Sequence, residues 1–298
     1  MRIALKVDVS SCQGAEQGVP NLLELLKQYD VKASFFFSTS PEPDSSGIFH
    51  ALSKAREVFG KASRSEDTTP SPALSNAVLA VLEAGHDAGV SAHDPEAWIR
   101  HAAFADEDWT RLQLALAIDS MRQIIGQAPR MFGAAGWQVN PHVITREENL
   151  GFSFASDTRG KYPFYPVLQN IRSGCPQIPT TLPTLSEMLG RAGIDTGNVH
   201  EYLYSESRYI LPLGHVYSAQ ANLEGLEHLD IMEKLLMMCV SRLLSLLLII
   251  LVRYSKLKLM LIYSLMQRCL LRLKFQVWSM TTPLIGSLHS RMYILLKM

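Results

Sequence analysis

Apolar and polar positions follow two rhythms in the first part of the chain: short apolar runs, and stretches with apolar residues at helical spacing. The run Ile3–Val9 (IALKVDV) is typical of a buried strand. Residues 21–29 (NLLELLKQY) follow Pro20 with leucines at helical spacing, and Val31–Ser38 (VKASFFFS) forms a second apolar run. Strand, helix and strand in this order indicate a βαβ unit and therefore a parallel sheet.

The same alternation continues to about residue 230. Residues 73–85 and 141–149 predict helices, and residues 87–93, 130–136 and 152–157 predict strands. The regular part closes with residues 177–184, a helix near Leu185 and residues 215–225. Repeated β–α alternation of this length is typical of a barrel or a doubly wound sheet.

A longer helix is expected at Trp109–Ile125, because the acidic residues at 106–108 favour a helix N-terminus. Its predicted apolar face consists of Leu112, Leu116, Ala117, Met121 and Ile124.

Residues 39–72 interrupt the alternation. They are rich in serine, proline and acidic residues, which predicts a loop or flexible insertion. No GxGxxG or GxxxxGKS motif follows the first strand, so nothing supports a nucleotide-binding site.

Composition excludes some classes of protein. Of the 298 residues, 47% are apolar and 19% are charged, which is enough for a sizeable core and excludes global disorder. The net charge of zero gives no reason to expect nucleic-acid binding. The N-terminus has no charged-then-apolar leader, so we expect a cytoplasmic protein. The four cysteines (Cys12, Cys175, Cys239 and Cys269) have no CxxC spacing and are expected to be buried or incidental thiols.

The zero net charge is an average of two unlike parts. Residues 1–236 carry 28 acidic and 19 basic residues, whereas residues 237–298 carry nine basic residues, no acidic residue and seven of the twelve methionines. We therefore expect a barrel domain at 1–236 and an aberrant basic tail at 237–298. The tail has two interpretations. It is a frame-shifted or degenerate segment, or it is a basic amphipathic segment that lies on the cytoplasmic face of an anionic membrane.

Several segments, in order, resemble one known family. They are residues 6–38, GVSAHDPEAW, GAAGWQVN, FASDTRG and QIPTTLPT, and they are similar to the polysaccharide deacetylase (NodB-homology) family over roughly residues 1–236. The resemblance is greatest to bacterial deformylases that act on formamido-arabinose linked to undecaprenyl phosphate. It implies a distorted (β/α) barrel, here incomplete at its C-terminal end. It also implies hydrolysis of an N-acyl group from an amino sugar, with a divalent metal such as zinc as cofactor.

The residues at the family's functional positions depart from its pattern. The family has a D-x-D motif, an H-x-x-x-H motif and a late T-x-H-A-E motif. Asp8 keeps the position of the family's base, but Ser10, Ser91 and Pro95 stand at the three metal-ligand positions. Gln220 stands at the position of the His that protonates the leaving amine.

These substitutions weaken the expected chemistry. A neutral serine hydroxyl is a poor zinc ligand, and proline has no side-chain donor. Without a metal, water keeps a pKa near that of bulk water, and Gln220 cannot deliver a proton to an amine. We therefore expect no bound metal and impaired catalysis. The alternative is a non-catalytic relic or a sugar-binding pseudoenzyme.

Two further sets of residues are candidates. His86, His93, Asp94 and Glu96 could form a shifted metal site with Asp8, although Pro95 argues against a straight strand through these positions.

Trp137, Asp157 and Arg159 are the expected substrate-binding residues: Trp137 by stacking on a sugar, and Asp157 and Arg159 by holding a sugar or phosphate. A half-buried core tryptophan and a loop ion pair are the alternatives.

Overall fold

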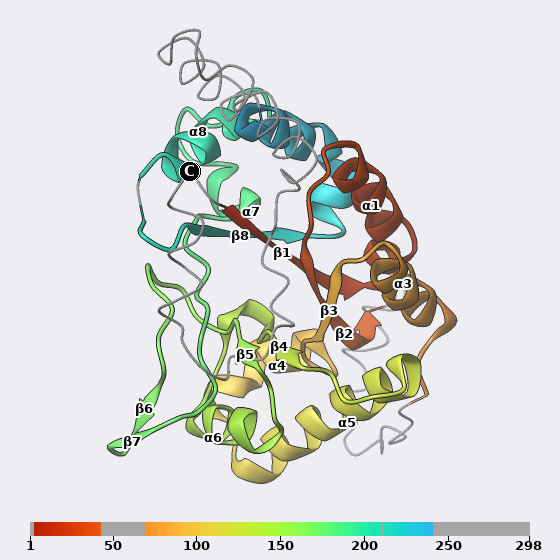
Figure 1. The fold of residues 1–298 in the computed structure, drawn as a ribbon, viewed down its shortest axis with the longest axis vertical. Coiled ribbons are helices and arrows are strands. Elements are labelled where there is room, and N and C mark those ends of the chain that lie inside the picture. Colours follow the sequence, from red (N-terminus) through yellow and green to blue (C-terminus); the bar gives the residue numbers. More distant parts are fainter. Residues whose placement is uncertain (1–2, 43–68, 210, 241–298) are drawn as a thin grey trace, which may run out of the picture.

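The computed structural model describes residues 3–42, 69–209 and 211–240, and its fold is the expected (β/α) barrel type (Figure 1). Six parallel strands form one curled sheet in the order β5-β4-β3-β2-β1-β8. The strands are β1 (Ile3–Ser11), β2 (Ser34–Glu42), β3 (Asp87–Val90), β4 (Met131–Phe132), β5 (Phe154–Ala155) and β8 (His215–Gln220). A separate antiparallel hairpin consists of β6 (Val167–Leu168) and β7 (Ile171–Arg172).

Helices cover the outer face of this sheet, as the crossover connections of parallel strands require. Figure 1 shows α1, α3 and α5 following one another around the outside of the strands. The helices are α1 (Val19–Gln28), α3 (Pro72–Glu83), α4 (Pro95–His101), α5 (Glu107–Ile125), α6 (Pro141–Asn149), α7 (Leu185–Met188) and α8 (Val199–Ser207).

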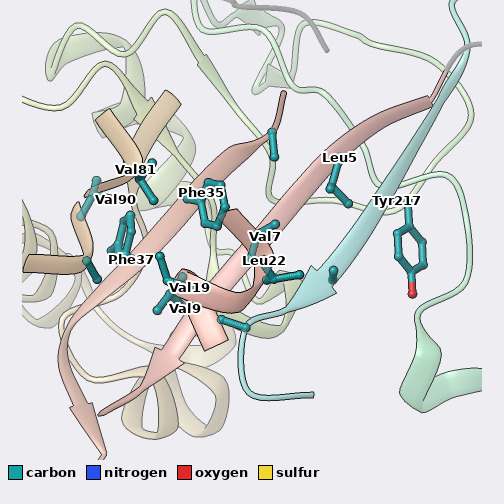
Figure 2. Close-up of a cluster of buried hydrophobic side chains, with 14 of the residues drawn as sticks. Leu5, Val7, Val9, Val19, Leu22, Phe35, Phe37, Val81, Val90 and Tyr217 are labelled. Atoms are coloured by element: carbon teal, nitrogen blue, oxygen red, sulfur yellow. The ribbon is translucent and has the colours of Figure 1, made fainter. Parts of the chain in front are cut away.

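Period-two alternation sorts the side chains of β1 and β2 onto two faces. Val7, Val9, Phe35 and Phe37 pack outward against helices α1 and α3, where Figure 2 shows them beside Val19, Leu22 and Val81. Phe36 belongs to a smaller cluster with Met131 and Phe154. Because Lys6 and Asp8 alternate with the outward valines, they share the inner face of the curled sheet with Phe36.

An irregular segment, residues 176–182, bridges the two edges of the curled sheet. Ala155 of β5 donates its N–H to Pro176 O at 2.9 Å, and Ile178 N donates to Ala155 O at 2.8 Å. At the other edge, Thr181 N donates to Val216 O of β8 at 3.1 Å. This segment overlaps the QIPTTLPT region (residues 177–184) singled out in the sequence, and it leaves neither edge strand entirely unpaired.

Most of the predicted elements are confirmed, with three differences. Residues 39–42 continue β2 instead of forming a loop, and the rest of the expected insertion lies largely outside the described residues. The buried face of α5 is centred on Leu114, Ala117, Ile118 and Met121, while Leu112 is 43% exposed. Helices α4 and α8 and the β6–β7 hairpin were not expected, because each is short and carries little periodic signal.

The described chain ends in a helix formed by residues 229–240. Leu235, Leu236 and Cys239 on this helix are buried in the main core, so helical structure crosses position 236. The proposed tail lies almost entirely outside the described residues, and the boundary at 236/237 stays a prediction. Among the described cysteines, Cys12, Cys175 and Cys239 form no disulfide bond. Within residues 3–42, 69–209 and 211–240, no helix is both long and apolar enough to cross a bilayer.

Candidate functional site

Asp8 lies on the inner face of the sheet, where it is in register with Phe36 of β2 on one side and with Gln220 of β8 on the other. Ser218 on β8 donates its hydroxyl to Asp8 Oδ2 at 2.7 Å. The Asp8 side chain keeps 29% of its surface exposed, whereas its ion-pair partner Lys6 is 4% exposed, with Lys6 Nζ 3.4 Å from Asp8 Oδ1. Asp8 is therefore a held but accessible carboxylate.

Lys6 is one of the residues near the site that the sequence analysis missed. Its ammonium group donates to the backbone carbonyl of Ser156 at 3.0 Å and lies 5.2 Å from the Phe36 ring centroid and 6.0 Å from that of Trp137. A charged side chain at 4% exposure requires such partners, because an unpaired buried charge is costly. The signal in the sequence was the pattern K-x-D inside an otherwise apolar strand, which puts both charges on one face.

Trp137 reaches the same region from the loop after β4. It ends the helical turn Ala135–Trp137, and both Gly136 (φ 60°) and Trp137 (φ 55°) have left-handed backbone conformations. This conformation is unfavourable for a bulky aromatic residue and persists only where neighbours hold it. The indole Nε1–H donates to Thr180 Oγ1 at 3.2 Å, and the Arg159 guanidinium lies 4.7 Å from the ring centroid.

The structure places Arg159 beside Trp137, and Arg159 is also paired with other groups. Its guanidinium donates to both oxygens of Glu187 at 2.9 and 3.1 Å and to Leu182 O at 3.1 Å. The expected role of Arg159 therefore competes with a loop ion pair at the rim of the site.

Asp157 is fully buried and holds the Trp137 loop from behind. Its Oδ1 accepts the backbone N–H of Ala134 at 2.7 Å, and its Oδ2 accepts Gln177 Nε2 at 3.0 Å. Since the carboxylate has no exposed surface, direct contact with a substrate would require the loop to move. Its contacts suit positioning better than binding.

A second buried carboxyl, Glu147 of α6, completes this cluster. Glu147 Oε2 accepts from Gln177 Nε2 at 2.9 Å, so one amide group serves both acids. Burial, and then the neighbouring charge of Asp157, raise the pKa of Glu147 far above its usual range. Glu147 therefore holds a proton at neutral pH. Burial also raises the pKa of the nearby Cys175 thiol, which makes it inert.

Gln220, which the sequence analysis assigned to the position of the family's histidine, ends β8 in register with Asp8. Its backbone N–H donates to Glu224 Oε2 at 2.8 Å, and the Tyr217 hydroxyl donates to Glu224 Oε1 at 2.8 Å. Burial raises the pKa of Glu224 to about 7. Glu224, which was not singled out from the sequence, fixes the end of β8 but is itself 1% exposed.

The residues at the three metal-ligand positions do not fit a metal site. Ser10 lies at an irregularity in the pairing of β1 with β2, and Ser91 is 3% exposed just after β3. Pro95 is the buried first residue of α4, and the preceding Asp94 uses its carboxylate to cap that helix, accepting Ala97 N–H at 2.9 Å. Within the part of the chain that the structure describes, no group of three or more His, Cys, Asp or Glu side chains could hold a metal ion.

The alternative metal site is contradicted by the position of His86. This residue precedes β3 and accepts the Ala33 N–H on Nδ1 at 3.1 Å, whereas His93 and Asp94 follow the opposite end of that strand. Burial, and then Lys32, lower the pKa of His86 to about 4. His93 Nδ1 is 2.8 Å from Thr39 Oγ1, and Glu96 pairs with Arg100 on the surface. Strand β3 thus separates His86 from His93 and Asp94, because each strand residue advances about 3.3 Å.

A curled parallel sheet with outer helices and a polar inner face defines a (β/α)-barrel protein. The chain belongs to the polysaccharide deacetylase family, whose model matches residues 2–155.

Curated relatives extend the similarity to most of the chain. It is 29% identical over 255 residues to a probable 4-deoxy-4-formamido-L-arabinose-phosphoundecaprenol deformylase ArnD of Shewanella sediminis, covering 79% of this chain and 80% of the relative. A protein of the same description from Wigglesworthia glossinidia brevipalpis is 25% identical over 262 residues, covering 76% and 84%.

Solved structures agree on the fold. A polysaccharide deacetylase from Mycobacterium smegmatis aligns with a TM-score of 0.56 at 16% identity, over 80% of this chain and 83% of its own. A second, from Pseudomonas aeruginosa PAO1, aligns with a TM-score of 0.55 at 18% identity, over 80% and 85%.

Proposed function

We propose that this chain binds the N-acyl amino sugar of its family, a formamido-arabinose on a phosphate-linked lipid, and that it is impaired in hydrolysing the N-acyl bond. The names of the two curated relatives support the substrate class. One observation supports the loss of chemistry: Pro95, which the sequence motif assigns to a metal-ligand position, is a buried residue in the first turn of α4. A cytoplasmic location is part of the same proposal.

The residues that remain suit recognition of a sugar. The Asp8 carboxylate can accept a hydrogen bond from a sugar hydroxyl or from the formamide N–H. The Trp137 indole offers a face for stacking, with the cations of Lys6 and Arg159 near it. An anionic phosphate on the ligand would compete with Glu187 for Arg159.

The same residues give little support to hydrolysis. With no metal to lower the pKa of water, Asp8 would have to act as base on bulk-like water. The Gln220 amide does not supply a proton to a leaving amine. The chain is thus expected to bind the sugar and to release it unchanged.

Calorimetric titration with a water-soluble formamido-arabinose phosphate, together with an assay for formate release, tests the proposal. We expect measurable binding, at least tenfold weaker binding by Trp137→Ala, and no formate above the uncatalysed level. Phe104→Ala is the control, because this side chain is 94% exposed and lies in the turn after α4. Metal-dependent formate release would contradict the loss of catalysis, and absence of binding would favour a non-functional relic.

A further inference from the structure

The β6–β7 hairpin is a projecting feature that the proposed sugar site does not use. Its two strands are joined by the two-residue turn Gln169–Asn170, both with left-handed φ values of 50° and 65°. This is the geometry of a type I′ turn, which matches the natural twist of a hairpin. Figure 1 shows the hairpin at the lower left, extending away from the sheet and the outer helices.

Large apolar side chains are concentrated on the segment that forms this hairpin, which we call the hairpin segment (residues 161–172). Tyr162 is 52% exposed, Phe164 43%, Val167 66% and Ile171 73%. Single exposed apolar residues are ordinary on a protein surface. Four within ten residues, on a projecting element, indicate an interaction surface.

The charge of the segment selects the kind of partner. Residues 158–186 contain no aspartate or glutamate, while Arg159, Lys161 and Arg172 are basic. Arg159 is already paired with Glu187, but Lys161 and Arg172 are exposed, and the Arg172 guanidinium lies 4.0 Å from the ring centroid of Tyr165. Aromatic rings with adjacent cations favour the boundary between lipid headgroups and acyl chains, where the cations meet lipid phosphates.

We propose that the hairpin segment docks onto an anionic lipid bilayer. Val167 pairs with Arg172 and Leu168 with Ile171, so Val167 and Ile171 point to opposite faces of the ribbon. The hairpin therefore enters end on, and its turn amides remain among polar headgroup atoms, which limits insertion to roughly 5–10 Å. This surface is distinct from the basic tail, and the proposal stands whether or not the sugar site binds.

Docking at the hairpin segment would bring the sugar site to the membrane. The segment begins two residues after Arg159, and its base is tied to the bridging segment through the pairing of Phe164 with Gln177, whose N–H groups donate to each other's carbonyls at 3.1 and 2.8 Å. The same bridging segment carries Thr180, which holds the Trp137 indole. The hairpin and the Trp137–Arg159 pair are thus parts of one connected loop system.

Phe104 provides a matched control on the same chain. It is 94% exposed, more than Tyr162, Phe164, Val167 or Ile171 of the hairpin segment, but Asp106, Glu107 and Asp108 follow it closely. An anionic membrane would repel this acidic surface. Phe104 and the hairpin segment are therefore both exposed and apolar but differ in the charge of their neighbours. Comparing them tests whether lipid contact requires basic neighbours as well as an exposed apolar side chain.

The test uses the full chain and vesicles of phosphatidylcholine, with or without phosphatidylglycerol. An Ile171→Trp variant should show fluorescence quenching by brominated lipids in the anionic vesicles beyond that of the parent, and Phe104→Trp should not. Flotation should show at least threefold weaker binding for Val167→Asp/Ile171→Asp and parent-like binding for Phe104→Asp.

Two results would overturn the proposal even if the basic tail holds the chain on vesicles. One is an unquenched tryptophan at position 171, and the other is parent-like binding of the double aspartate variant. A lipid-free dimer that dissociates in Val167→Asp/Ile171→Asp would assign the surface to a second copy instead.

Discussion

The ammonium group of Lys6 and the carboxylate of Asp8 lie 3.4 Å apart on the inner face of the barrel, two residues from each other on one strand. A strand places such residues on the same side, so β1 alone fixes this pair. Lys6 is anchored by Ser156 O and Asp8 by the Ser218 hydroxyl, which ties β1 to the loop after β5 and to β8. The pair therefore links structural stability to the candidate site.

Replacing Lys6 should show how much the Lys6–Asp8 pair contributes to the free energy of unfolding. Lys6→Met is expected to lower the free energy of unfolding by about 1–3 kcal/mol, because it leaves Asp8 partly buried without its cation. In a double-mutant cycle with Asp8→Asn, urea unfolding should give a coupling energy of about 1–2 kcal/mol. The control is Lys234→Met on the exposed Lys234–Asp230 pair, expected to change stability by less than about 1 kcal/mol. Additive effects of the Lys6 and Asp8 changes would show that the two charges do not interact.

Glu147→Gln should become increasingly more stable than the parent chain as the pH rises. The folded-state pKa of Glu147 is raised, so the folded chain binds more protons than the unfolded chain above the ordinary glutamate pKa. Its contribution is fully present below that ordinary value and falls as the pH rises, by up to about 1.4 kcal/mol per pH unit. A glutamine keeps the neutral form, since it can accept from Gln177 and donate toward Asp157.

Urea unfolding at pH 5, 7 and 8.5 should therefore show that the parent and Glu147→Gln have nearly equal free energies of unfolding at pH 5. At pH 7 and 8.5 the variant should be increasingly more stable than the parent. The neighbouring exposed Glu148, which accepts the Gly174 N–H at 2.7 Å, provides the control. Glu148→Gln should shift stability by the same small amount at each pH. An equal pH dependence of Glu147→Gln and the parent would show that Glu147 is ionised in the folded state.

The alternation of apolar runs and helical spacing was sufficient to predict the parallel sheet and most of its helices. It worked because Val7, Val9, Phe35 and Phe37 are buried between two layers, and burial of this kind leaves a periodic pattern. It failed for the β6–β7 hairpin, where two-residue strands leave no period to read. It also predicted the wrong buried face for α5, since Leu112 is apolar but exposed.

The candidate site was only partly visible in the sequence. Trp137 and Arg159 were named from motifs, and the structure brings them together. Asp157 was expected at the substrate, yet no local pattern shows that its carboxylate faces Ala134 and Gln177 in the interior. Glu147 belongs to the same cluster through the fold alone, because it lies 30 residues from its partner Gln177.

The purified chain is expected to hold no stoichiometric zinc, cobalt or nickel, and a triple change should restore binding. Ser10→Asp, Ser91→His and Pro95→His together should raise zinc affinity far more than any single change, because a complete ligand set acts as a unit. Isothermal titration of the single and triple variants measures this. Zinc bound by the parent would contradict the loss of the site, and a triple variant no better than the parent would show that these positions do not converge.

Gly18→Ala should disrupt the contact between the first helical turn and the end of β8. A methyl group on Gly18 would clash with the backbone carbonyl oxygen of Ala221, and backbone cannot move aside as a flexible side chain can. We expect a loss of about 3 kcal/mol or more in urea unfolding. The control Gly126→Ala, where φ is 79° but nothing lies within 4 Å, should lose only about 1 kcal/mol. Similar losses for both would show that this close approach is not needed.

Removing the basic tail should improve solubility, provided that the cut spares the last described helix. Residues 237–298 carry nine basic residues and no acidic one, so their composition does not continue that of the barrel. Cys239, however, is buried with Leu235 and Leu236, and a cut after residue 236 would uncover their surface. A chain ending at Val240 should therefore be more soluble than both the full chain and one ending at Leu236, by soluble fraction and light scattering. A full chain that is monomeric and melts cooperatively, and that loses this melt when cut after Val240, would show that the tail is an integral part of the fold.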